Sequence, residues 1–144
     1  EFVKDEARRG TASAVWNVLR DRRLSEFIYS HGNVLVGEDS LRRIAQASSE
    51  ASALAVSADS QGETHPRVRV GADSLVEGIA DVQASVRSVG LAVFRAVPEV
   101  SKGNDPAAHV PVESMMLETS PLSTVKAVDV GSDWRHLEDL SFYP

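Results

Sequence analysis

An internal repeat is the sequence feature that most constrains how this chain folds. Residues 31–41 (His-Gly-Asn-Val-Leu-Val-Gly-Glu-Asp-Ser-Leu) align with residues 65–75 (His-Pro-Arg-Val-Arg-Val-Gly-Ala-Asp-Ser-Leu). The offset is 34 residues, and seven of the eleven positions are identical. Two copies indicate a duplicated supersecondary unit, whereas a solenoid needs three or more repeats. The sequence therefore predicts two similar units in the middle of the chain.

Each copy has the pattern of a strand, a tight turn and a capped helix. Its Val-x-Val segment alternates β-branched residues, as a short strand does, and the next glycine permits a sharp exit from the strand. Asp and Ser are typical helix N-caps, because their side chains accept hydrogen bonds from backbone N–H groups. The two predicted turns consist of Gly37, Asp39 and Ser40, and of Gly71, Asp73 and Ser74.

The segments after the two turns decide the fold class. In the second copy, apolar residues recur at four- and three-residue steps over residues 75–89 and predict a helix that ends at Gly90. Residues 91–97 are rich in strand formers and predict a strand. Residues 53–57 predict the matching strand in the first copy.

The resulting order of strand, helix and strand, present twice, predicts an α+β fold. It corresponds to a ferredoxin-like βαββαβ core over residues 31–98. The alternative is a mostly α-helical hairpin, in which residues 91–97 continue the second helix, because short apolar runs fit both patterns. RNA-recognition domains and small-ligand regulatory domains share the βαββαβ order, but a shared fold does not imply a shared function.

The predicted core has two different flanks. Residues 1–30 form an N-terminal region in which residues 3–28 have the periodicity of an amphipathic helix. Residues 99–144 form an acidic, proline-containing arm with three basic and eight acidic residues, and so hold most of the formal net charge of −6. Within this arm, residues 124–130 alternate as an edge strand does.

The end of the arm is the strongest candidate for a partner-docking segment. Aromatic side chains are the most effective interface anchors, and a helical turn with one apolar face fits a groove. The candidate docking residues are Trp134, Leu137, Leu140, Phe142 and Tyr143. They can dock on their own domain or on a neighbouring subunit.

Few residues suggest catalysis or metal binding. The absence of cysteine excludes disulfides, thiolate zinc sites and a cysteine nucleophile. The four histidines, at positions 31, 65, 109 and 136, lack the helical spacing of a zinc site, so we expect no metal and no cofactor. His31 and His65 are interpreted as turn or capping residues before a strand. We therefore expect no catalytic residues, and an enzymatic function is uncertain.

Nucleic-acid and membrane partners are not expected either. A net-acidic chain neutralises phosphates poorly, although Arg8, Arg9, Arg22 and Arg23 on the N-terminal helix are candidate contacts. No apolar run approaches the roughly 18–20 residues of a membrane span. The chain starts at Glu1 and not at Met, which suggests a fragment or a processed product.

Together these observations predict a non-catalytic module for protein–protein interaction or self-assembly. The expected partner is a second copy of the chain, in a homo-oligomer, or another protein, and the expected location is the cytoplasm. One alternative is a regulatory domain that binds a small ligand at the two strand–helix turns. A second alternative is a coat or scaffold protein that contacts nucleic acid through its arginine-bearing helix.

Overall fold

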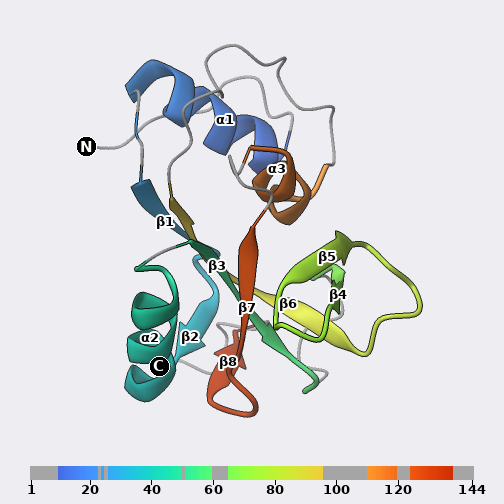
Figure 1. Ribbon diagram of the computed structural model, residues 1–144. Helices are drawn as coiled ribbons and strands as arrows, with labels where there is room; N and C mark the ends of the chain where they lie inside the picture. The colour runs from blue at the N-terminus through green and yellow to red at the C-terminus, as the bar shows by residue number, and fades with distance from the viewer. Residues whose placement is uncertain are drawn as a thin grey trace.

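A mixed α+β architecture built mostly from strands is seen in the computed structural model, which describes residues 10–22, 24, 26–49, 51–59, 65–95, 110–119 and 124–137 (Figure 1). Over these residues there are three helices and eight strands. In chain order they are α1 (Thr11–Arg22), β1 (Glu26–Ser30), β2 (Val34–Val36), α2 (Glu38–Ala47), β3 (Ser52–Ser57), β4 (Arg67–Val70), β5 (Val76–Ile79), β6 (Val86–Arg95), α3 (Val112–Thr119), β7 (Val125–Asp129) and β8 (Trp134–His136).

Six of the strands form one sheet in the order β5-β4-β6-β3-β7, and β1 pairs with β6 beside this path. β3 and β7 run parallel, and the other pairs in the described chain are antiparallel. A second sheet consists of β2 and β8 alone. The predicted C-terminal arm thus supplies one edge strand of the large sheet and half of the small one.

Both faces of the large sheet are covered, as the burial of its central strands shows. All six residues of β3 are buried, and successive side chains point to opposite faces. Leu54 and Val56 belong to a core cluster with α1 and α3, whereas Ala53 and Ala55 pack in a second cluster with α2, β2 and β8. Figure 1 shows α1 and α3 together at one end and α2 beside β2 at the other. This explains why residues 53–56 of β3 are all apolar and do not alternate with polar residues.

Several predictions from the sequence are confirmed. The mixed α+β class is correct, and the alternative of a helical hairpin is wrong. Strands lie at residues 34–36, 52–57 and 67–70, and residues 125–129 form an edge strand. A helix follows the first turn of the repeat, as expected.

The predicted helix over residues 75–89 is wrong, so the expected ferredoxin-like order is not formed there. This segment contains β5, a turn and the start of β6. The turn forms because Asp81 Oδ1 accepts a hydrogen bond from the Gln83 N–H (2.9 Å) and the Asp81 carbonyl accepts one from Ala84 (3.0 Å). The four-three spacing of valines therefore did not reflect a helical face, because Val82 in the turn is 76% exposed.

The flanking helices also differ from the prediction. α1 ends at Arg22, and residues 26–30 are the strand β1 and not the end of a long helix. β-Branched and aromatic residues favour this strand, in which Phe27 stacks on Phe94 of β6 with ring centroids 4.4 Å apart. The sequence did not predict α3, and residues 1–9 lie outside the described chain. No helix in the described ranges is long and apolar enough to cross a membrane.

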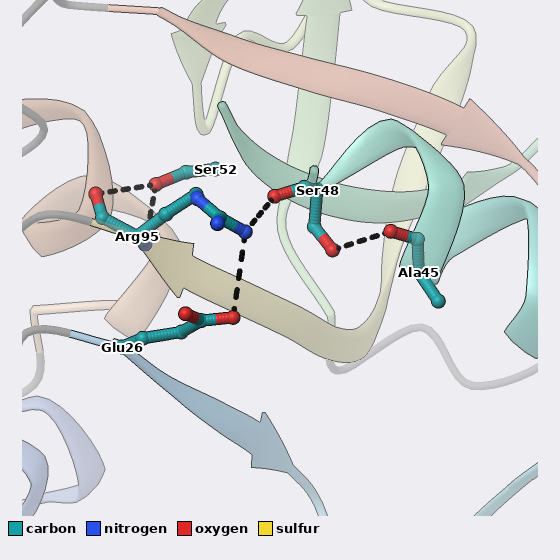
Figure 2. A network of polar contacts seen from close by, with 5 residues as sticks. All are labelled: Glu26, Ala45, Ser48, Ser52 and Arg95. Atoms are coloured by element: carbon teal, nitrogen blue, oxygen red, sulfur yellow. Dashed lines mark hydrogen bonds and ion pairs between the residues drawn. The ribbon is translucent and has the colours of Figure 1, made fainter. Parts of the chain in front are cut away.

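A polar network ties the C-terminal end of α2 to the last residue of β6 (Figure 2). Arg95 Nη1 donates a hydrogen bond to the Ser48 carbonyl (2.6 Å) and lies 3.4 Å from Glu26 Oε1. Ser52 Oγ accepts a hydrogen bond from the Arg95 N–H (2.9 Å). The arginine therefore satisfies a carbonyl at the end of a helix that has no basic residue in its last turn.

We expect the Arg95→Met substitution to lower the free energy of unfolding by about 1–2 kcal/mol, because a charge-assisted hydrogen bond to Ser48 is lost. The matched variant Glu26→Gln removes only an ion pair between partly exposed groups and is expected to cost less than about 1 kcal/mol. Urea unfolding of both variants measures the difference. Equal losses would show that the contact with the helix end contributes nothing.

Candidate histidine site

Three histidines from separate parts of the chain meet at one cavity. His31 directly follows β1, His65 precedes β4, and His136 is the last residue of β8. The ring centroids of His31 and His65 are 4.9 Å apart, and those of His65 and His136 are 5.3 Å apart. Both ring pairs meet edge to face. His65 thus lies between the other two rings.

Gly90 in the middle of β6 makes this close approach possible. Its φ angle is +82°, which side chains other than glycine rarely adopt. A Cβ atom at this position would lie 2.5 Å from Cδ2 of His31 and 2.7 Å from Cε1 of His65. The Gly90 carbonyl also accepts a hydrogen bond from the His31 N–H (2.9 Å). The missing side chain therefore provides the space in which two of the rings lie.

Hydrogen bonds orient the two outer rings. Tyr29 Oη lies 2.8 Å from His31 Nε2, and Thr11 hydrogen-bonds the same tyrosine through its side chain. Asn33 Nδ2 lies 3.1 Å from His136 Nε2. Because an amide nitrogen can only donate, Nε2 of His136 is the acceptor in that bond. The Tyr29 hydroxyl pairs with Nε2 of His31 as donor or as acceptor, according to the tautomer of that ring.

His65 is held differently. The residue is 4% exposed, and its Nε2 atom is buried with no hydrogen-bond partner among the described residues. Arg87 Nη1 donates to the His65 carbonyl (2.9 Å) and so fixes the backbone of this segment. The ring is thus positioned through its backbone and its neighbours, while Nε2 keeps its capacity for a hydrogen bond.

A buried carboxylate completes the polar set. Glu113 lies in the first turn of α3, is 5% exposed, and accepts a hydrogen bond from Ser88 Oγ (2.6 Å). Ser88 Oγ in turn accepts one from the Gly90 N–H (3.1 Å). An acidic residue after Pro111 is typical of a helix start, because it complements the positive end of the helix dipole. Glu113 is therefore coupled to the strand that carries Gly90.

These side chains line a cavity of about 380 Å³, a size that fits a small-molecule ligand. The first residues of α1 and of α3 both lie in its wall. The lining residues within the described part of the chain are Gly10, Thr11, Tyr29, His31, Asn33, His65, Pro66, Val110, Pro111, Val112, Glu113 and His136.

Burial disfavours the charged forms of three aromatic side chains of the cavity, His65, His31 and Tyr29. It lowers the pKa of His65 to about 4, with further lowering from His31, His136 and Arg87. It also lowers the pKa of His31, where the negative charge of Glu113 acts in the opposite direction. Burial and the same carboxylate raise the pKa of Tyr29. The cavity therefore offers neutral hydrogen-bonding groups around one carboxylate.

The histidines do not form a metal-binding set. Among the described residues, no group of three or more His, Asp or Glu side chains has an arrangement that could hold a metal ion. The Nε2 atoms of His31 and His136 are already paired with Tyr29 and Asn33.

The first predicted turn is packed against another part of the chain. α2 begins at Glu38, directly after Gly37, so Asp39 and Ser40 lie inside its first turn and the predicted side-chain cap is wrong. Ser40 Oγ instead donates to Asp133 Oδ2 (2.7 Å), and the Gly37 N–H donates to the Asp133 carbonyl (3.1 Å).

The second predicted turn leads into a hairpin and not into a helix, so a helix cap at Asp73 or Ser74 is also wrong. The Gly71 N–H donates to the Leu75 carbonyl (2.8 Å), and Ser74 has a φ angle of +58° between β4 and β5. None of the six predicted turn residues lines the histidine cavity.

The predicted docking segment is only partly described. Trp134 lies in β8 and not in a helix, and it is 3% exposed in a core cluster with Ile44 and Val89 of the same chain. Leu137 is half-buried, and its N–H donates to the Asn33 carbonyl (2.7 Å). Three other predicted docking residues lie outside the described chain, namely Leu140, Phe142 and Tyr143.

The side chains of the four arginines predicted as nucleic-acid contacts lie outside the described part of the structure. Arg22 is the last residue of α1. Arg8, Arg9 and Arg23 lie outside the described residues.

The sequence did contain one signal for the histidine site. His31 and His65 occupy equivalent positions in the repeat, each just before a Val-x-Val strand. Read as turn residues, they gave no reason to expect a cluster. His136 and Glu113 are far from both in the sequence, and only the pairing of β6 with β1 and β4 brings the two repeat histidines to Gly90.

No protein-family model and no curated protein matches this sequence. Solved structures do. The inositol-1-phosphate CTP transferase from T. maritima matches with a TM-score of 0.71 and 19% identity, over 95% of this chain and 59% of that chain. HddC from Yersinia pseudotuberculosis, complexed with GMP-PN, matches with a TM-score of 0.65 and 14% identity, over 95% and 60%. The mannose-1-phosphate geranyltransferase from Thermus thermophilus matches with a TM-score of 0.54 and 14% identity, over 92% and 53%.

These similarities concern the fold, and they correct the functional prediction. The chain spans about three fifths of the length of the first two of these structures. Two of the three are named as transferases that act on a 1-phosphate. The expectation of a non-catalytic interaction, assembly, coat or scaffold module is therefore wrong, and so is its premise that no histidine constellation exists.

We expect Gly90→Ala to destabilise the protein more than Gly131→Ala. Gly131 also has a positive φ angle (+54°), but nothing lies within 4 Å of a Cβ atom placed there. Alanine at 131 therefore incurs only backbone strain of about 1–2 kcal/mol. Alanine at 90 adds a clash with two histidine rings, for about 1–3 kcal/mol more.

Thermal and urea unfolding of the two variants test this expectation. An equal effect of both substitutions would mean that the rings do not lie against Gly90.

Proposed function

We propose that this chain acts in group transfer on the 1-phosphate of a polyhydroxylated ring, and that the histidine cavity binds the ring. The observation that carries this proposal is a set of hydrogen-bonding side chains, among them the buried Tyr29, His65 and Glu113, that line one cavity of ligand size. The similarity in fold to transferases also favours a group-transfer function.

The chemistry of the cavity suits hydroxyl groups. A hydroxyl both donates and accepts, so it can pair with an imidazole, an amide, a phenol or a carboxylate. Asn33, Tyr29, Glu113 and the histidines offer all four in one wall. Among the described residues, no lysine or arginine side chain lines the cavity. The wall therefore offers no positive charge to bind the phosphate itself.

The phosphate is better placed at the helix starts that border the cavity. Gly10 and Thr11 begin α1, and backbone N–H groups at a helix N-terminus favour an anion. The carboxylate of Glu113 disfavours an anion close to α3. We therefore assign the phosphate to the α1 side of the cavity and the ring to the side of Glu113 and His65.

The names of the similar structures agree with this assignment. Two of them specify inositol 1-phosphate and mannose 1-phosphate, which are phosphate esters of six-membered rings with several hydroxyls. Two also involve a nucleotide, CTP in one and GMP-PN in the other. A nucleotide as the second substrate is accordingly part of the proposal.

We expect titration calorimetry to detect binding of myo-inositol 1-phosphate or mannose 1-phosphate, and much weaker binding of free myo-inositol or mannose. Glu113→Gln should weaken binding of the 1-phosphate about tenfold or more, because a hydrogen bond from a ring hydroxyl to a charged group is lost. The control Glu38→Gln changes an exposed glutamate of α2 outside the cavity and should have no effect. Failure of both 1-phosphates to bind would contradict the proposal.

The transfer step is tested by incubating the protein with CTP or GTP and either 1-phosphate. In that step a phosphate oxygen of the 1-phosphate attacks the α-phosphorus of the nucleotide, and pyrophosphate leaves. We expect pyrophosphate to be released only when the 1-phosphate is present. The release is measured by ³¹P NMR. Consumption of neither nucleotide would contradict the catalytic part.

A further inference from the structure

We infer that His65 is a specificity-determining residue of the cavity, whose buried Nε2 atom hydrogen-bonds one particular hydroxyl group of the bound ring. This inference rests on the proposed function, which it makes more specific. It concerns a residue that sequence reasoning had interpreted as a turn residue.

The hydrogen-bonding state of His65 is the first argument. Buried polar atoms in native proteins nearly always have a partner. Nε2 of His65 is buried and has none among the described residues, although the ring lines the cavity. The corresponding atoms of His31 and His136 are paired with Tyr29 and Asn33. Of the three Nε2 atoms, that of His65 is therefore the one able to pair with a ligand.

The electrostatics of the site select a hydroxyl as the ligand group. Burial and the neighbouring Arg87, His31 and His136 keep the His65 ring uncharged at neutral pH, so it has no charge with which to attract an anion. A cation would meet the guanidinium of Arg87 close to the same ring. A hydroxyl satisfies Nε2 in either tautomer, because it can donate or accept.

The rigidity of His65 is what makes the contact selective. Its carbonyl is held by Arg87, and its ring lies between the rings of His31 and His136 and against Gly90. A ring held on these sides can make only the small shift that exposes Nε2 to a hydroxyl in the cavity, and it cannot follow a hydroxyl at another position. Preorganised polar groups reject ligands that lack the matching group, because the protein atom is then left unpaired.

The test uses myo-inositol 1-phosphate or mannose 1-phosphate, whichever binds, and its monodeoxy analogues, with affinities measured by titration calorimetry. We expect the wild-type protein to bind one monodeoxy analogue about 10-fold to 100-fold more weakly than the parent compound. The His65→Phe variant keeps a ring of similar shape without its nitrogens. It should bind the parent and that analogue with equal affinity.

The ratio of the two affinities within one protein is the decisive quantity, because a general loss of structure changes both alike. The His65→Gln variant retains a hydrogen-bond donor and an acceptor, so it should keep part of the discrimination between the parent and the analogue. This variant provides the test if His65→Phe does not fold. Equal binding of all analogues by the wild type, or full discrimination by His65→Phe, would overturn the role of His65 and leave the proposed function intact. Failure of every 1-phosphate to bind would contradict the proposed function itself.

Discussion

The contact between a bare glycine and two histidine rings is the constraint on which the functional part of this structure depends. β6 crosses the middle of the large sheet and pairs with β1, β3 and β4, so its position is fixed on both sides. Gly90 lies within it at a positive φ angle and leaves room for His31 and His65. Ser88, two residues earlier, holds Glu113 and thereby the start of α3. One strand thus positions a pair of rings and a carboxylate around a single cavity.

The cavity is a product of long-range pairing and not of a local motif. Its polar side chains come from the start of α1, the end of β1, the segment before β4, the start of α3 and the end of β8. Because burial lowers the pKa of His31 and of His65 and so keeps both rings uncharged, the site combines neutral donors and acceptors with one carboxylate, which suits hydroxylated ligands better than anions. The hydrogen-bonding groups of the cavity therefore favour the same class of compound as the names of the similar structures, a ring with several hydroxyl groups.

The sequence predicted what local patterns determine and missed what tertiary contacts determine. β-Branched residues correctly indicated the strands at 34–36 and 125–129, because the preference of these residues for strands is a local property. The two repeat copies diverge after their shared Val-x-Val-Gly segment, into α2 in the first and the β4–β5 hairpin in the second. Spacing alone could not separate these outcomes. The histidine cluster was missed because Gly90 was interpreted as a helix end and His136 has no sequence link to the repeat.

The most direct test of the central claim is an NMR pH titration of the histidine ring resonances in the full chain. Close packing around Gly90 predicts that His65 titrates near pH 4 and that His31 titrates below the ordinary value of 6.5. Burial is the largest cause of both lowered pKa values, and the contributing neighbours are His136, Arg87 and Glu113, with His31 acting on His65. Titration of both rings near 6.5 would show that they are solvated and apart, and would contradict a shared histidine cavity.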